Sequence, residues 1–135
     1  MHSKSLVAVC TSLALIISPI AAALSVNCRG GFVCLMEDMY ITETLTAYLE
    51  MLDPDDYFYE GSQIACYHNV CAFVQNADGA YGDVIQDAAR SILRHGCLTC
   101  GSAPLGYPNV TDVTHGELTY NAVSDSCRRD GICPA

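Results

Sequence analysis

Residues 81–102 have the sequence YGDVIQDAARSILRHGCLTCGS, and this stretch predicts the principal helix of the fold. Its apolar side chains recur at the i, i+3, i+4, i+7 spacing of one helical face: Tyr81, Val84, Ile85, Ala88, Ala89, Ile92 and Leu93. Gly96 stands where a C-terminal glycine cap belongs. Packing against a core explains the apolar face fully, so this helix needs no ligand.

A second amphipathic helix is predicted over residues 36–52. The apolar side chains again recur at helical spacing: Ile41, Leu45, Tyr48, Leu49 and Leu52. Glu37 and Asp38 lie at its start, where the positive end of the helix dipole favours acidic groups.

Strands are predicted between and after these helices. Residues 63–75 are β-rich and end at the turn 76–79, and alternating apolar residues predict a last strand over 117–123. The glycines and prolines between 101 and 108 predict a loop. This order of elements predicts an α+β fold, an α/β sandwich in which two antiparallel helices cover a mostly antiparallel sheet.

Residues 1–23 have the order of a cleaved secretory signal peptide. A start with Lys4 precedes the apolar run Leu6–Ile17, and small residues follow at Ala21–Ala23. The alternative is a membrane anchor, but serines and a proline interrupt a run that is short for a span. We therefore expect an extracellular protein with one domain over residues 24–135.

Eight cysteines remain once Cys10 is removed with the signal peptide, and an even number suits a disulfide framework in an oxidising compartment. They are Cys28, Cys34, Cys66, Cys71, Cys97, Cys100, Cys127 and Cys133. A zinc site built on Cys97, Cys100 and His95 is the alternative, together with a redox role for the same pair. No second close pair at ligand spacing accompanies them. The sequence therefore predicts four disulfides and neither metal nor cofactor.

The chain is strongly acidic, with a formal net charge of −9. This charge disfavours binding to nucleic acid and to anionic lipid surfaces. Acidic and aromatic residues concentrate in one segment: Asp53, Asp55, Asp56, Tyr57, Phe58, Tyr59 and Glu60. A solvated loop is the plain interpretation, and no calcium-binding loop of EF-hand spacing fits. We predict that this segment is the recognition surface.

An enzyme is not expected. His68, His95 and His115 could serve as bases and Ser102 or Ser124 as a nucleophile, but no Gly-x-Ser-x-Gly elbow or metal-binding histidine pair is present. A paired-carboxylate glycosidase is the remaining alternative. The domain is small for a carbohydrate cleft and contains no tryptophan. The sequence therefore predicts no catalytic residue.

Four blocks of the sequence resemble the successive signature blocks of the fungal killer-protein-four family, in the family's order. They are Asn27-Cys28-Arg29-Gly30, residues 71–76 (CAFVQN), residues 95–104 (HGCLTCGSAP) and residues 116–124 (GELTYNAVS). The resemblance implies a small secreted toxin with an α/β sandwich fold and no enzymatic activity. It also implies growth inhibition of competing or host cells through calcium channels. The expected partner is a target-cell membrane protein such as a calcium channel or another extracellular protein, and the expected state is a monomer.

The resemblance also implies two disulfides, Cys28–Cys97 and Cys34–Cys100. The four other cysteines then have only one another as bonding partners. We expect Cys66 and Cys71 to pair with Cys127 and Cys133, in an order that the sequence leaves open.

The chain departs from the family's founder in charge. The founder is basic and carries a lysine just before a central cysteine, where this chain has Gln63-Ile64-Ala65 ahead of Cys66. No lysine follows Lys4, so only arginines could replace that cation: Arg90, Arg94, Arg128 and Arg129. An alternative function is therefore a secreted binding or effector module, or an inhibitor, without channel activity.

One modification site is predicted. Asn109-Val110-Thr111 is an acceptor sequon for N-glycosylation in a Gly/Pro-rich loop. An unmodified turn is the alternative.

Overall fold

The computed structural model describes residues 24–135. The predicted signal peptide, residues 1–23, lies outside the described residues. In chain order the elements are η1 (Phe32–Met36), α1 (Ile41–Leu49), β1 (Tyr57–Tyr59), β2 (Ala65–Tyr67), β3 (Val70–Gln75), β4 (Gly79–Tyr81), α2 (Gly82–Arg94), β5 (Gly101–Pro104), η2 (Val113–His115), β6 (Glu117–Ala122) and β7 (Asp130–Ile132).

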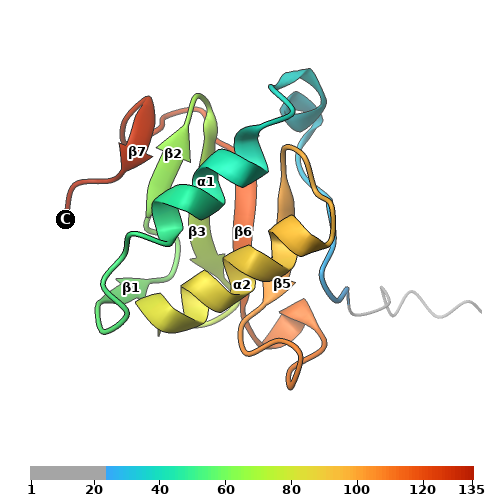
Figure 1. The fold of residues 1–135 in the computed structure, drawn as a ribbon, viewed down its shortest axis with the longest axis vertical. Helices are drawn as coiled ribbons and strands as arrows, with labels where there is room; N and C mark the ends of the chain where they lie inside the picture. Colours follow the sequence, from blue (N-terminus) through green and yellow to red (C-terminus); the bar gives the residue numbers. More distant parts are fainter. Residues whose placement is uncertain (1–23) are drawn as a thin grey trace, which may run out of the picture.

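Five strands form an antiparallel sheet in the order β5-β6-β3-β2-β7, and β1 pairs with β4 in a separate two-stranded ribbon. Figure 1 shows α1 and α2 side by side on one face of the larger sheet, running in opposite directions. The predicted fold class, two antiparallel helices on a mostly antiparallel sheet with disulfide staples, is confirmed.

The core lies between the two helices and the sheet. Apolar side chains that the helical spacing predicted on one face, such as Leu45 and Ile92, are fully buried there. Two polar groups are placed within this layer. The Tyr120 hydroxyl lies 3.0 Å from that of Thr46 on α1, and the Gln86 amide on α2 donates to the carbonyls of Leu49 and Leu52. Gln86 thereby donates to the carbonyl of the last residue of α1 and to one carbonyl of the turn that follows the helix.

Two elements differ from the prediction. The upstream helix begins at Ile41 rather than at 36, because Asp38 accepts a hydrogen bond from the Tyr40 amide and turns the chain there. Gly101–Pro104, predicted as loop, is strand β5, whose four residues are buried against β6. Pro104 is compatible with this strand because β5 ends the sheet order and Pro104 is its last residue. The glycine cap is as predicted, with Gly96 at φ +90° and its amide donating to Leu93.

Candidate functional site

The acidic-aromatic segment, residues 53–60, leads into the small ribbon rather than the main sheet. Strand β1 pairs with β4 so that Tyr57 lies opposite Tyr81 and Phe58 opposite Ala80. Because side chains alternate along a strand, Phe58 and Ala80 pack toward the core while the tyrosines face outward. Tyr59 is 69% exposed and Tyr81 54%.

The three outward tyrosines form one cluster. The ring of Tyr57 makes edge-to-face contacts with Tyr59 and Tyr81, at centroid distances of 5.2 Å and 5.0 Å. This geometry suits the quadrupoles of aromatic rings and holds them as a unit. The ribbon thus presents a rigid patch of aromatic surface with three phenolic hydroxyls.

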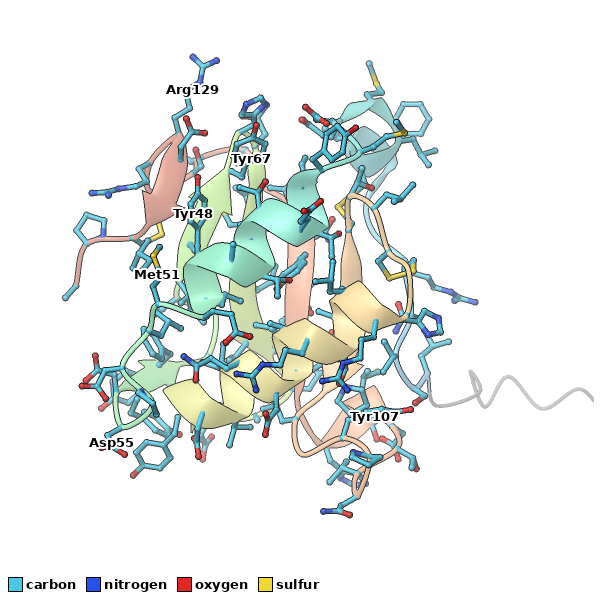
Figure 2. All side chains as sticks on the ribbon, in the orientation of Figure 1. Tyr48, Met51, Asp55, Tyr67, Tyr107 and Arg129 are labelled. Carbon is cyan, nitrogen blue, oxygen red and sulfur yellow. A yellow bond between two sulfur atoms is a disulfide. The ribbon has the colours of Figure 1, made fainter. Side chains whose placement is uncertain are left out.

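The acidic end of the segment is fixed to the start of α2. The Asp53 carboxylate accepts from the Asp55 amide at 2.9 Å, and the Gly82 amide donates to the Asp56 carbonyl at 2.8 Å. Apart from the Asp53 carboxylate, these contacts use backbone groups of the segment, and the side chains of Asp55 and Asp56 are exposed to solvent. Figure 2 shows Asp55 at the outer end of this loop. Glu60, at the other end of β1, is exposed as well.

A groove of about 550 Å³ borders this segment. One wall is formed by Leu52 and the three residues of β1, and the other by the C-terminal residues 132–135. We call the segment and this groove together the acidic-aromatic face. The sequence analysis identified the first wall but missed the second. No local signal marks the C-terminal residues, because only strand pairing of β7 with β2 brings them there.

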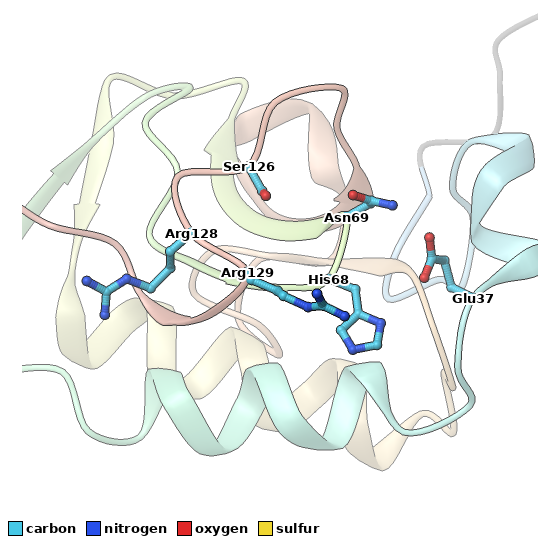
Figure 3. A pocket seen from close by; sticks show the side chains of 6 residues that line it. All are labelled: Glu37, His68, Asn69, Ser126, Arg128 and Arg129. Carbon is cyan, nitrogen blue, oxygen red and sulfur yellow. The ribbon is translucent and has the colours of Figure 1, made fainter.

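Arg128 and Arg129 do not line the groove of the acidic-aromatic face. Together with Glu37, His68, Asn69 and Ser126, they line a polar cavity of about 400 Å³, and Figure 3 shows Arg129 next to His68 with Arg128 directed away. The Arg129 carbonyl accepts from the His68 amide at 2.7 Å, which attaches the C-terminal arm to the β2–β3 turn. Figure 2 shows Arg129 and Asp55 at opposite ends of the molecule, so these cations do not belong to the acidic-aromatic face.

Residues 63–65, which stand where the founder has its lysine, have a structural role in this chain. Ile64 and Ala65 are buried. The Gln63 amide donates to the Asp125 carbonyl and its carbonyl oxygen accepts from the Cys127 amide. This position therefore offers no cation to a partner and instead holds the C-terminal arm.

The structure contains both disulfides that the resemblance implies. Cys28–Cys97 ties the segment before η1 to the turn after α2, and Cys34–Cys100 ties η1 itself to that turn, with sequence separations of 69 and 66. Because all four sulfurs are consumed, the zinc and redox alternatives at Cys97 and Cys100 have no free thiol to use.

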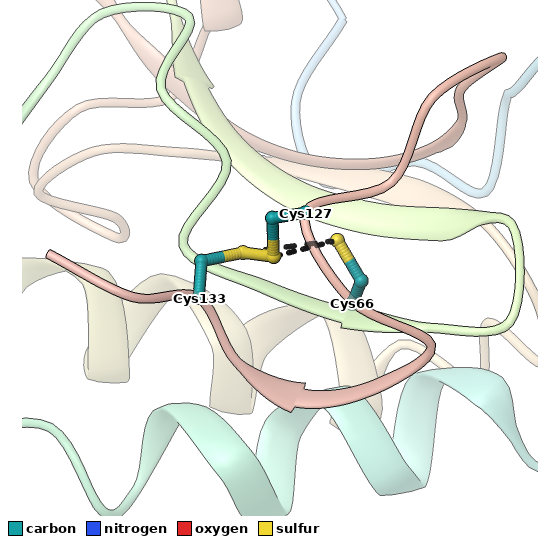
Figure 4. A group of neighbouring side chains, drawn as sticks. All are labelled: Cys66, Cys127 and Cys133. Carbon is teal, nitrogen blue, oxygen red and sulfur yellow. Dashed lines mark hydrogen bonds between the residues drawn. A yellow bond between two sulfur atoms is a disulfide. The ribbon is translucent and has the colours of Figure 1, made fainter.

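The expected pairing of the other four cysteines is wrong. The structure joins Cys66 to Cys71 and Cys127 to Cys133. The reason is register: the β2–β3 hairpin sets Cys66 directly opposite Cys71, with their Cα atoms 4.1 Å apart. The two bridges do lie together, since the Cys66 sulfur is 3.6 Å from that of Cys127 and 3.8 Å from that of Cys133 (Figure 4). Across residues 24–135 these three sulfurs are the only trio spaced as metal ligands, and all are in disulfides.

Asn109 lies in an exposed loop between β5 and η2. The sequon therefore remains a prediction of N-glycosylation on an accessible side chain. Treating the secreted protein with an amidase that removes N-glycans should increase its gel mobility. Asn109→Gln should migrate like the treated protein from the outset. Unchanged mobility of the native protein after treatment would mean an unmodified turn.

None of the helices in residues 24–135 is long and apolar enough to cross a membrane.

Comparison with known proteins gives one family. The Kp4 family model matches residues 10–124, which include all four sequence blocks and the acidic-aromatic segment. The match ends before β7, the two C-terminal arginines and the Cys127–Cys133 bridge. No curated protein matches the chain.

Proposed function

Because the chain belongs to the Kp4 killer toxin family, whose toxins are non-enzymatic and generally inhibit calcium channels, we propose that it inhibits the growth of competing or host cells by binding a protein on their surface. It is a small disulfide-bonded protein and not an enzyme. On this proposal, residues 1–23 direct export and residues 24–135 form the active extracellular domain.

The acidic-aromatic face is the proposed recognition surface. The observation that carries this proposal is the tyrosine cluster. Tyr57, Tyr59 and Tyr81 are each at least 39% exposed, and a contiguous exposed aromatic patch usually has a binding role. Tyrosine is also enriched among residues that dominate binding energy at interfaces. The adjacent groove gives a partner side chain a place to insert.

The charge of this face restricts the partner. Asp53, Asp55, Asp56 and Glu60 are exposed around the cluster, so a negatively charged target would be repelled and a basic or neutral one favoured. A calcium ion bridging two acidic surfaces would also reconcile the charges. This chain has no lysine at the position where the founder carries one, before Cys66. If it acts on a calcium channel, contact through the tyrosines and carboxylates is the proposed route.

A second candidate function is a secreted binding or effector module without channel activity. The observation that favours it is the structural role of Gln63 to Ala65 where the founder has its lysine: Ile64 and Ala65 are buried and Gln63 holds the C-terminal arm. The two candidate functions can be distinguished by adding oxidised protein to fungal hyphae and plant seedling roots, with and without excess calcium. Growth arrest relieved by calcium supports channel inhibition, and arrest that calcium leaves unchanged supports another extracellular target.

Neutralising the acidic-aromatic face should abolish or strongly weaken activity without unfolding the protein. In the triple variant Asp55→Asn, Asp56→Asn and Glu60→Gln, the free energy of unfolding should stay within about 0.5 kcal/mol of the parent, because all three side chains are exposed. Growth inhibition of a sensitive organism should fall at least about tenfold, or about 1.4 kcal/mol of binding.

The matched control is the double variant Arg128→Gln and Arg129→Gln at the opposite end of the molecule. It should retain activity. A fully active triple variant beside an inactive arginine variant would place recognition at the C-terminal arm and contradict the proposal.

A further inference from the structure

Exposed apolar side chains gather at η1, away from the acidic-aromatic face. A 3-10 helix has three residues per turn, so side chains three apart in sequence lie on the same ridge. In η1, Phe32 and Leu35 form one ridge and Val33 and Met36 a second, while Cys34 occupies the third and is buried. Phe32 is 77% exposed, Leu35 82% and Met36 76%. Packing therefore uses one ridge of η1 and leaves two apolar ridges in solvent.

The exposed apolar surface continues onto the start of α1 and the turn after α2. Met39, Tyr40 and Leu98 are each at least 56% exposed, and they line one groove of about 250 Å³. The Thr42 amide of α1 donates to the Leu98 carbonyl at 3.1 Å, which joins the helix to that turn. We call the six side chains exposed by more than half in this region the apolar tip: Phe32, Leu35, Met36, Met39, Tyr40 and Leu98. Soluble monomers rarely expose contiguous apolar patches of more than a few hundred Å², so the tip marks an interaction site.

The tip is held in place by contacts to the body of the protein. The Cys34–Cys100 disulfide anchors the middle of η1, and the Gly31 amide donates to the Asn121 side chain on β6 at 2.9 Å. The chain also passes directly over the disulfide, since a Cβ atom at Gly30 would lie 2.6 Å from the Cys34 sulfur. Figure 1 shows η1 standing out beyond α1 at one end of the molecule. The tip is therefore a preformed projection, and covering it costs little ordering of the chain.

The charges around the tip restrict what can cover it. Residues 30–36 carry no charged side chain. Asp38 and Glu43 are exposed next to the tip, and Glu43 lines its groove. Leu93 lines the other side of this groove and is followed by the exposed Arg94. The surroundings thus carry both signs of charge, on a chain whose formal net charge is −9. This charge opposes contact with an anionic lipid surface.

A second copy of the chain fits the tip poorly. In a symmetric dimer each surface patch meets itself, so Asp38 and Glu43 of the two copies would be brought together and would repel. Two projecting surfaces also make little contact with each other. The covering surface should therefore be one that a projection can enter.

A neutral bilayer with choline headgroups meets these requirements. Its quaternary ammonium groups complement the carboxylates of Asp38 and Glu43, and aromatic ring faces such as those of Phe32 and Tyr40 attract such cations. Tyrosine side chains are also enriched at the level of the headgroups. Below that level the acyl boundary can take up apolar side chains. The contact is interfacial, since no helix in residues 24–135 is long and apolar enough to cross the bilayer.

We propose that the apolar tip inserts into the interface of a neutral, choline-bearing lipid bilayer, with Phe32, Leu35 and Met36 reaching the acyl boundary. This goes beyond the proposed function, in which the acidic-aromatic face binds a protein. Figure 1 shows η1 and β1 at opposite ends of the molecule, and the apolar tip shares no residue with the acidic-aromatic face. A tip in the bilayer therefore leaves the acidic-aromatic face free to bind its partner.

The test is sedimentation of the oxidised, secreted protein with vesicles of pure phosphatidylcholine. The protein should bind with an apparent Kd on the order of 1 mM lipid, about tenfold weaker than a single myristoyl chain. The double variant Phe32→Ser and Leu35→Ser should bind at least about tenfold more weakly. Replacing part of the choline lipid by phosphatidylserine should also weaken binding, because the chain is acidic. Because these vesicles contain no protein, a failure here leaves the proposed growth inhibition standing.

A matched pair of single variants keeps the test decisive if the double variant fails to fold. Met36→Ser should weaken binding to phosphatidylcholine vesicles. Met51→Ser should leave binding unchanged, although Met51 is 64% exposed, because Figure 2 shows it on the side of the molecule away from η1.

Three outcomes would overturn the proposal. The first is a parent protein that stays in the supernatant at lipid concentrations well above the expected Kd. The second is equal binding by the two methionine variants, or binding that phosphatidylserine strengthens. The third is a parent that sediments as a dimer without lipid while Met36→Ser is a monomer, which would assign the tip to contact between copies of this chain.

Discussion

Removing the Cys28–Cys97 disulfide should lower the free energy of unfolding by about 4 kcal/mol. The bridge joins residues 69 apart, so breaking it restores a large loop-closure entropy to the unfolded chain, about 4 kcal/mol in the chain-entropy model. Most single domains are stable by only about 5–15 kcal/mol. The double variant Cys28→Ala and Cys97→Ala should therefore be marginally stable, which chemical denaturation followed by circular dichroism can measure.

The Cys127–Cys133 bridge provides the matched control. Its residues are only six apart, so the same model predicts a loss smaller by about 2 kcal/mol for Cys127→Ala and Cys133→Ala. Both double variants lose one bridge and keep an even number of cysteines. Equal losses in the two would contradict the entropic account and would indicate that local packing of the bridges decides stability.

Replacing Gly82 by alanine should destabilise the protein by about 1–3 kcal/mol, as overpacking does, although alanine is ordinarily the better helix residue by about 1 kcal/mol. Gly82 is the first residue of α2, and a Cβ atom there would lie 2.2 Å from the Asp53 carbonyl oxygen and 3.2 Å from the Pro54 Cα. Backbone atoms cannot rotate away as a side chain can. The acidic-aromatic segment must shift to make room for this methyl group. The variant should therefore unfold at a lower temperature than the parent, and its growth inhibition should be weaker.

Gly31→Ala is the control for this change. Gly31 has φ −64°, and its nearest contact for a Cβ atom is the Asn121 side-chain oxygen at 3.4 Å, an ordinary distance. This variant should keep the parent's stability within about 0.5 kcal/mol. A Gly82→Ala protein that is more stable than the parent would show that the loop from Asp53 accommodates the methyl group. The loop would then not be held as rigidly as its hydrogen bonds to α2 indicate.

The elements that the sequence predicted well are those whose signal is local. Helix α2 occupies Gly82–Arg94 and is followed by the glycine cap at Gly96, as the spacing and the glycine indicated. Strands β3 and β6 likewise lie within their predicted ranges. In each case a run of apolar side chains with one period specifies both the element and its buried face. The acidic-aromatic segment was also recognisable, because composition alone distinguishes it.

Other features became evident only in three dimensions. Strand β5 is built from glycine, serine and proline residues with weak strand preference, and its pairing with β6 overrides that preference. The pairing of Cys66 with Cys71 follows from hairpin register, which cysteine spacing does not encode. The C-terminal wall of the groove depends on contacts between residues far apart in sequence, because β7 pairs with β2.

The sequence by itself thus determined the helices, the fold class, the family and the number of disulfides. Each follows from short-range periodicity, from a count, or from motifs that are contiguous along the chain. The tertiary structure alone decided which cysteines pair, which loop becomes a strand and which polar residues share a pocket. The physical reason is that these depend on strand register and long-range packing, whose free energy is shared among many residues and is carried by no single stretch of the chain.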